Sequence, residues 1–223
     1  MEYRQVRFAV PPGATDMFLI RHGESAPAVP GQPFDRLADG QGDPPLAPEG
    51  VAQAASGASR LVEAGIDAVY VTTLRRTVET AAPLLGKLGL TPAVEPDLRE
   101  VHLGEWEAGV FRMKVAAGDP IVLRMVAEQR WDVVPGAEPD EVFTARVRAG
   151  IQRLHADNPG RRLAVFTHSG VIGCVLSLAT GASRLAFSRS DNGSITRIVV
   201  DGPEWHVRSF NDTAHLADEH TRE

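Results

Sequence analysis

Arg21 and His22 are the residues whose types and spacing most directly suggest chemistry. They come immediately after a short apolar run, residues 17–20, and before Gly23. An arginine can bind a phosphate or a carboxylate through two parallel hydrogen bonds, and a histidine near pH 7 can act as a nucleophile or a base. Gly23 allows a sharp turn and a close approach of a ligand. This stretch indicates a site for an anionic ligand, although a strand end with a solvated arginine is the simpler alternative.

Other reactive residues also follow strand-like runs. Arg76 comes shortly after the run 67–71, His168 comes directly after the run 163–167, and Glu100 ends a further strand-like segment. Parallel strands bring their carboxyl ends to one edge of a sheet, so these side chains should converge with the first pair. Each residue alone has a simpler interpretation as a core or surface group. Their repeated placement at strand ends favours one shared site.

The segments that would position these residues alternate between two types. We expect strands at residues 17–22, 67–71, 92–95 and 163–167, and helices at 48–63, 74–88, 137–156 and in a last segment that runs on to Ala179. This alternation is typical of a mostly parallel sheet with helices on both faces. Residues 194–200 and 205–210 alternate around Asp201-Gly202, which predicts a hairpin. We therefore expect an α/β fold, a three-layer sandwich, with an antiparallel edge hairpin and a helical insertion over the site.

The whole chain, residues 1–223, is expected to form a single domain, because its length and its 43% hydrophobic content suffice for one core. Residues 1–14 would be a leader that packs loosely or pairs at a sheet edge. Residues 26–47 are rich in Pro, Gly and Asp and predict a loop beside the site. Residues 106–136, interrupted by Gly and Pro, predict a lid-like insertion of short helices. The polar tail 217–223 is expected to fray.

Composition limits the partners that the protein can have. The net charge of −6 argues against nucleic acid, and the absence of a long apolar run argues against a membrane span. The single cysteine, Cys174, excludes an internal disulfide and fits a reducing compartment. The N-terminal residues do not resemble a signal peptide. A cytoplasmic protein that acts on a small molecule is the expectation, and a homodimer remains open.

Six segments carry a family resemblance. They are RHGES at 21–25, PLAPEG at 45–50, TTLRRTVETA at 72–81, LREVHLGEWE at 98–107, FTHSGVI at 166–172 and NGSIT at 192–196. In this order, and spread over nearly the whole domain, they resemble branch 1 of the histidine phosphatase superfamily, the phosphoglycerate-mutase-like branch. The resemblance implies that His22 is a nucleophile that becomes phosphorylated and that Glu100 is the proton donor. It also implies a phosphate pocket, whose residues would be Arg21, Arg76, His168 and Ser25, with His168 counted as catalytic too.

This assignment needs neither a metal ion nor another cofactor. Guanidinium groups beside His22 should lower its pKa and keep the imidazole neutral and nucleophilic. A metal site built from His22, His102, His168 and Glu100 is an alternative. The adjacent arginines disfavour that alternative, because they would repel a cation.

The resemblance implies a metal-independent phosphomonoesterase, with a cofactor-dependent phosphoglycerate mutase as the alternative. Pro27 and Ala28 stand where family mutases usually have Trp and Asn, and residues 106–140 lack the adjacent arginine pair that grips the mutase substrate. A phosphate-binding relative without turnover is a third hypothesis, and the presence of every expected reactive residue argues against it. The substrate could be a small phosphorylated molecule or a phosphoprotein. Aromatic residues could line the substrate mouth or pack the insertion onto the body; they are Trp106, Phe111 and Trp131.

Overall fold

The computed structural model describes residues 2–216, and its centre is one six-stranded sheet. The strands are β1 (Thr15–Arg21), β2 (Ala68–Val71), β3 (Ala93–Val94), β4 (Arg162–Thr167), β5 (Ile195–Asp201) and β6 (Glu204–Asp212). They lie in the order β3-β2-β4-β1-β5-β6, parallel from β3 to β1 and antiparallel on either side of β5. The mostly parallel sheet and the antiparallel edge hairpin are confirmed. The predicted frayed tail, 217–223, lies outside the described residues.

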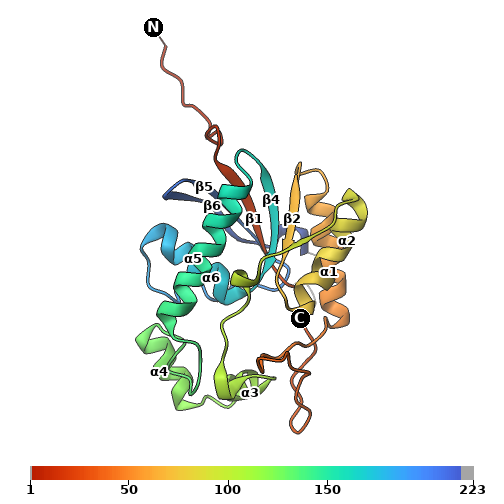
Figure 1. Cartoon of the computed structure of the whole chain (residues 1–223), viewed down its shortest axis with the longest axis vertical. Coiled ribbons are helices and arrows are strands. Elements are labelled where there is room, and N and C mark those ends of the chain that lie inside the picture. Colours follow the sequence, from red (N-terminus) through yellow and green to blue (C-terminus); the bar gives the residue numbers. More distant parts are fainter. Residues whose placement is uncertain (1, 217–223) are drawn as a thin grey trace.

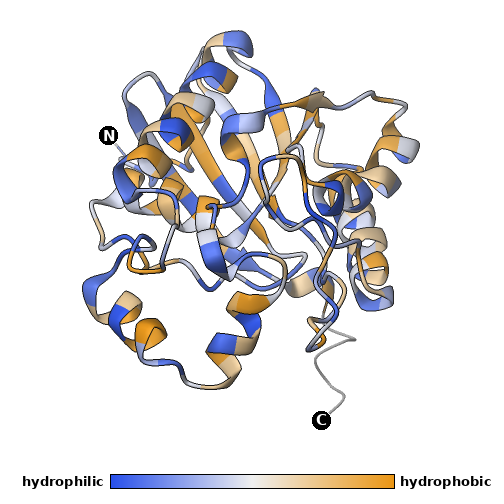
Figure 2. Cartoon of the chain, turned by 60° about the horizontal axis from the view of Figure 1, so that its bottom comes forward, coloured by the Kyte–Doolittle hydropathy of each residue, from blue (hydrophilic) through white to orange (hydrophobic). Residues whose placement is uncertain are grey.

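Helices cover both faces of this sheet (Figure 1). On one face lie α1 (Pro48–Leu61) and α2 (Arg75–Leu88), and on the other lie α5 (Asp140–Asp157) and α6 (Ser169–Thr180). Figure 2 shows apolar strands enclosed between helices whose surfaces are mixed. The predicted three-layer α/β sandwich is therefore confirmed.

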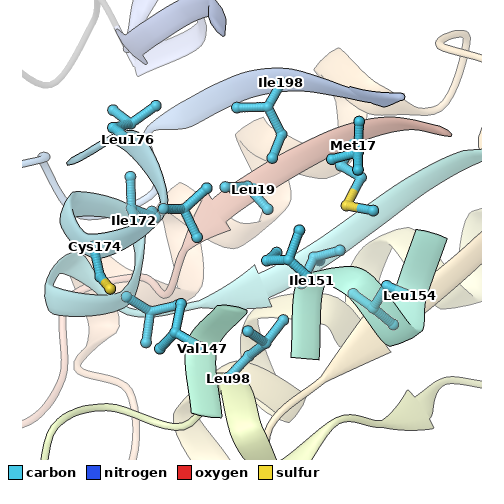
Figure 3. Close-up of a cluster of buried hydrophobic side chains, with 14 of the residues drawn as sticks. Met17, Leu19, Leu98, Val147, Ile151, Leu154, Ile172, Cys174, Leu176 and Ile198 are labelled. Atoms are coloured by element: carbon cyan, nitrogen blue, oxygen red, sulfur yellow. The ribbon is translucent and has the colours of Figure 1, made fainter. Parts of the chain in front are cut away.

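Strand β1 is buried on both faces and so joins the two halves of the core. Met17 and Leu19 pack toward α5 and α6, and Figure 3 shows this cluster. Phe18 and Ile20 point the other way, into the cluster beneath α1 and α2. Successive side chains of a strand point to opposite faces, so a strand covered on both sides reads as a continuous apolar run. That explains why the run before Arg21 carries no polar alternation.

Several element boundaries differ from the prediction by a few residues. Helix α5 begins at Asp140 rather than at residue 137, because Pro139 disfavours a helical conformation in the residue before it. Strand β1 begins at Thr15, two residues earlier than expected. Two further 3-10 turns connect elements, η1 (Pro96–Leu98) and η3 (Ala214–Leu216).

The insertion is helical, as predicted. It contains η2 (Gly104–Trp106), α3 (Val110–Ala116) and α4 (Pro120–Glu128). In Figure 1 these helices lie beyond the lower ends of β1 and β4, on the same side as the loop 26–47. The insertion has a small core of its own, formed by Trp106, Met125, Val133 and Val134.

The leader forms no strand over its described part, residues 2–14. It touches the sheet edge through side chains, because the guanidinium of Arg208 on β6 lies 3.7 Å from the ring centre of Phe8. Of the two alternatives, pairing at a sheet edge is not formed, and the contact with the edge is a cation–π interaction. Within residues 2–216, no helix has both the length and the apolar character that crossing a membrane requires.

Candidate active site

The carboxyl ends of β1 and β4 bring the predicted reactive residues together. Four of them line one cavity of about 270 Å³, namely Arg21, His22, Arg76 and Glu100. His168 lies against this group, fully buried, with its ring centre 5.2 Å from that of His22. The convergence expected from strand ends is therefore what the structure shows.

The imidazole of His22 is fixed in one tautomer. Its Nδ1 lies 2.7 Å from the carbonyl oxygen of Gly23, which can only accept a hydrogen bond, so Nδ1 must carry the proton. Nε2 is then unprotonated and has a free lone pair. Burial lowers the pKa of His22 well below its ordinary value, and the charges of Arg76 and Arg21 lower it further. This ring is a neutral nucleophile at physiological pH.

Gly23 is needed for close packing of the turn after β1 against α1. A Cβ atom at this position would lie 2.4 Å from the carbonyl oxygen of Gly50 in α1. The backbone of Gly23 donates a hydrogen bond to the hydroxyl of Thr80 in α2 at 3.0 Å. Both helices of one face thus hold the turn that carries His22.

Arg21 and Arg76 supply positive charge beside His22 without being neutralised. Burial lowers the pKa of Arg21 and lowers that of Arg76 to about 10, so both remain charged at pH 7. Among residues 2–216 neither forms an ion pair within 4 Å. Each has one guanidinium contact with a backbone carbonyl, Arg21 with Ser190 and Arg76 with Gly42. Buried guanidinium groups with donors to spare form a binding site for an anion.

Glu100 faces the same cavity and is held by backbone groups. Its Oε1 accepts a hydrogen bond from the N–H of Val101 at 3.0 Å, and its Oε2 accepts one from Gly170 at 3.2 Å. A side chain at Gly170 would collide with the carboxylate, since a Cβ there would lie 2.4 Å from Oε1. Burial raises the pKa of Glu100, while the two N–H groups and the arginines oppose the rise. A carboxyl with a raised pKa can exchange a proton with a ligand.

His168 is held by a hydrogen bond with Thr72, a residue that does not line the cavity. Its Nε2 lies 3.0 Å from the hydroxyl of Thr72, and its Nδ1 is buried with no hydrogen-bond partner among the described residues. The unpaired Nδ1 is costly unless something bonds it. Burial, followed by the charge of Arg76, lowers the pKa of His168.

Ser25 does not belong to the cavity lining. Its hydroxyl accepts a hydrogen bond from the Nη2 of Arg112 in α3 at 2.6 Å, so it holds a lid residue. Arg112 itself lines the cavity, and the sequence analysis did not identify it as a site residue. Its contact with Ser25 joins segments 87 positions apart, which no local pattern could indicate.

Two further residues position Glu100 and were missed by sequence reasoning. Arg146 of α5 donates to the carbonyl oxygens of Asp97, Arg99 and Glu100 at 2.8, 2.6 and 3.0 Å. The amide of Gln41 donates to the carbonyl of Glu100 at 3.0 Å. Both act on the backbone, so neither belongs to a side-chain motif.

The metal alternative finds no support in the described part of the chain. Among residues 2–216, no three His, Cys, Asp or Glu residues are grouped to hold a metal ion. His102 instead directs its ring toward backbone groups, with Nε2 3.3 Å from the carbonyl of Asp39 and Nδ1 accepting from Gly104. It does not line the cavity.

Comparison with known proteins places this geometry in a family. The chain belongs to the histidine phosphatase superfamily (branch 1), whose family model matches residues 17–213. It is 29% identical over 205 residues to phosphoglycerate mutase-like protein 4 of Arabidopsis thaliana, covering 90% of this chain and 86% of that one. The family predicted from the six motifs is confirmed.

Solved structures share the fold. A mycobacterial glucosyl-3-phosphoglycerate phosphatase in complex with inorganic phosphate matches with a TM-score of 0.68 and 25% identity, over 90% of this chain and 98% of that one. Phosphoglycerate mutase from Bacillus anthracis matches with a TM-score of 0.74 and 22% identity, over 94% and 98%. Phosphatases and mutases are thus both similar to this chain, and the site itself must decide between the two activities.

Proposed function

We propose that this protein is a metal-independent phosphomonoesterase that hydrolyses a small phosphorylated substrate through a phosphohistidine on His22. The observation that carries the proposal is the state of His22. Its Nδ1 proton is committed to Gly23, its lowered pKa keeps the ring neutral, and two unpaired arginines lie beside it. That arrangement favours attack by Nε2 on the phosphorus of a bound dianion.

In the first step, Nε2 of His22 forms a bond to phosphorus while the bond from phosphorus to the ester oxygen breaks. Arg21 and Arg76 offset the charge on the phosphoryl oxygens, which is greatest in the transition state. Glu100 gives its proton to the departing alkoxide, which leaves as an alcohol. The buried Nδ1 of His168 gains a partner if it donates to a phosphoryl oxygen.

In the second step, water replaces the alcohol. Glu100, now a carboxylate, takes a proton from the water as its oxygen attacks phosphorus, and the bond to His22 breaks. Inorganic phosphate is released, and His22 and Glu100 return to their starting states. In both steps the charged groups come from the protein itself, namely Arg21, Arg76 and Glu100.

The mutase alternative requires that the phosphoryl group pass to a second hydroxyl rather than to water. Arg112 is the lid arginine that lines the cavity, and its guanidinium already donates to Ser25 and to the carbonyl of Ala26. A second arginine beside it is absent from the sequence, since Phe111 and Met113 flank it. The grip on a substrate carboxylate is therefore weak, which favours water as the acceptor.

The test is to trap the intermediate. The protein is mixed with a ³²P-labelled alkyl phosphate, quenched in alkali within milliseconds, and analysed for protein-bound label that acid removes. We expect label on the wild type and on His206→Ala, a matched control at a histidine outside the cavity, and none on His22→Ala. Label that persists in His22→Ala contradicts the proposal.

A second assay distinguishes the two enzyme activities. Supplied with 3-phosphoglycerate and a bisphosphoglycerate primer, the protein should release inorganic phosphate or leave the substrate unchanged. Formation of 2-phosphoglycerate faster than phosphate release would assign the mutase activity instead.

A further inference from the structure

Beyond the phosphate-binding residues, the wall of the same cavity is apolar. It is formed by Phe34, Pro44, Val101, Leu103, Phe111 and Trp131. These residues come from the loop 26–47, from the segment after Glu100 and from the two ends of the insertion. The leaving group of a bound phosphate ester would lie against this wall, since the phosphate itself must lie at His22.

The aromatic part of the wall is held in place before any ligand binds. The ring centre of Phe111 lies 6.2 Å from that of Trp106 and 6.1 Å from that of Trp131, in tilted arrangements. Trp106 is 5% exposed and belongs to the small core of the insertion. Trp106 therefore packs the insertion, while Phe111 and Trp131 remain partly exposed and offer ring surface to a ligand. Tilted aromatic pairs are attractive beyond the area that they bury.

The wall also holds two groups of opposite charge, Arg112 and Glu107, and each of them is hydrogen-bonded within the protein. The guanidinium of Arg112 donates hydrogen bonds to the hydroxyl of Ser25 and the carbonyl oxygen of Ala26. Its Cζ lies 5.4 Å from the ring centre of Phe34. Glu107 is buried and lines the cavity, and its carboxylate accepts hydrogen bonds from backbone N–H groups of Leu103 and Gly42 at 2.7 and 2.8 Å. Both groups are thus engaged by the protein, and the apolar side chains of the wall remain as the surface for the leaving group.

We propose that the cavity selects phosphate monoesters whose leaving group presents a flat, uncharged, apolar surface such as an aromatic ring. This inference rests on the proposed phosphatase function, and it names the class of substrate. Phe111 and Trp131 contact the ring. The cavity of about 270 Å³ suits one ring beside a phosphate rather than a large molecule.

The test compares esters whose alcohols leave with similar basicity, so that binding of the leaving group is what varies. Phosphate release is measured for 2-phenylethyl phosphate, butyl phosphate and 3-phosphoglycerate. We expect kcat/KM for the phenylethyl ester to exceed that for the butyl ester about tenfold, and 3-phosphoglycerate to be the poorest of the three. Equal values for the phenylethyl and butyl esters, or a preference for 3-phosphoglycerate, overturn the specificity.

Variants then locate the preference. Phe111→Leu should reduce the ratio of kcat/KM for the phenylethyl ester to kcat/KM for the butyl ester at least about threefold. Phe8→Leu makes the same chemical change in the leader and should leave the preference unaltered. A preference that Phe111→Leu does not alter overturns the assignment of the wall. The wild-type series decides the question even if the Phe111 variant does not fold.

Failure of this inference is distinguishable from failure of the proposed function. If the butyl and phenylethyl esters are both hydrolysed with equal kcat/KM and His22 becomes labelled, the phosphatase stands and the aromatic preference falls. If no ester in the series is hydrolysed and no label appears on the protein, both proposals fall.

Discussion

Two parts of the cavity are built in different ways. One is its floor, which we define as Arg21, His22, Arg76 and Glu100, and the other is the apolar wall described above. Arg21 and His22 of the floor lie at the end of β1, and Arg76 lies in the first turn of α2. Close backbone contacts such as that of Gly23 with Gly50 hold the turn that carries His22. The wall consists of side chains from the loop 26–47 and from an insertion that has its own small core. A change in the floor must disturb the sheet or its helices, whereas a change in the wall need not. The catalytic residues therefore depend on the packing of the sheet and its helices, whereas the residues that select the substrate do not.

Glu100→Gln should produce the largest loss after removal of the nucleophile itself. The amide keeps the size of the side chain but cannot protonate the leaving alkoxide. We expect kcat on an alkyl phosphate to fall roughly 10² to 10⁴-fold. On an aryl phosphate, whose leaving group needs little protonation, the fall should be much smaller. An equal loss on both substrates would show that Glu100 is not the acid.

Arg146→Ala tests whether the floor extends behind the residues that touch substrate. Arg146 binds three carbonyl oxygens in the segment that ends at Glu100, so its loss should displace that carboxyl. We expect kcat on an alkyl phosphate to fall about 10- to 100-fold, and more than on an aryl phosphate. Arg148→Ala, at an exposed position on the same helix, is the control. A fall of the same size on both substrates would indicate a merely structural role.

The sequence revealed those parts of the floor that depend on local patterns. The run before Arg21 and the run before His168 are short, apolar and followed by glycine, so they predict strand ends with reactive side chains. Arg146 and Gln41 could not be found in this way, because they bind backbone carbonyls far away in the chain. The type and spacing of residues indicate what their side chains can do, but they do not indicate which distant backbone carbonyl a side chain binds. The hydrogen bond between the side chains of Ser25 and Arg112 was missed because the two residues are 87 positions apart.

Burial of the histidines in and beside the floor should make the free energy of unfolding of the protein depend on pH. The pKa of His22 is lowered in the folded protein, whereas in the unfolded chain it keeps the ordinary value of about 6.5. Below that pH the unfolded state binds more protons, so the free energy of unfolding falls as pH falls. Each such histidine contributes up to about 1.4 kcal/mol per pH unit.

His22→Asn should therefore make the decline between about pH 6.5 and 5 shallower by up to that amount. The asparagine amide can still donate to the carbonyl of Gly23, which limits other changes. Urea unfolding at several pH values measures the slope. His206→Asn, at a histidine outside the cavity, should keep the slope of the wild type. An unchanged slope in His22→Asn would mean that the ring takes up its proton in the folded state.

Arg112→Ala has the smallest expected effect, and it tests where the wall begins. Arg112 lines the cavity but donates to Ser25 and Ala26, while Arg21 and Arg76 have donors free for the phosphate. A charged hydrogen bond to the phosphate would be worth roughly 10- to 150-fold in rate. We expect kcat/KM for butyl phosphate to fall less than about tenfold, and Arg112→Lys to behave like the wild type. A loss of about 100-fold on every ester would place Arg112 in the floor, because only contact with the phosphoryl group, common to all substrates, would be felt equally by each.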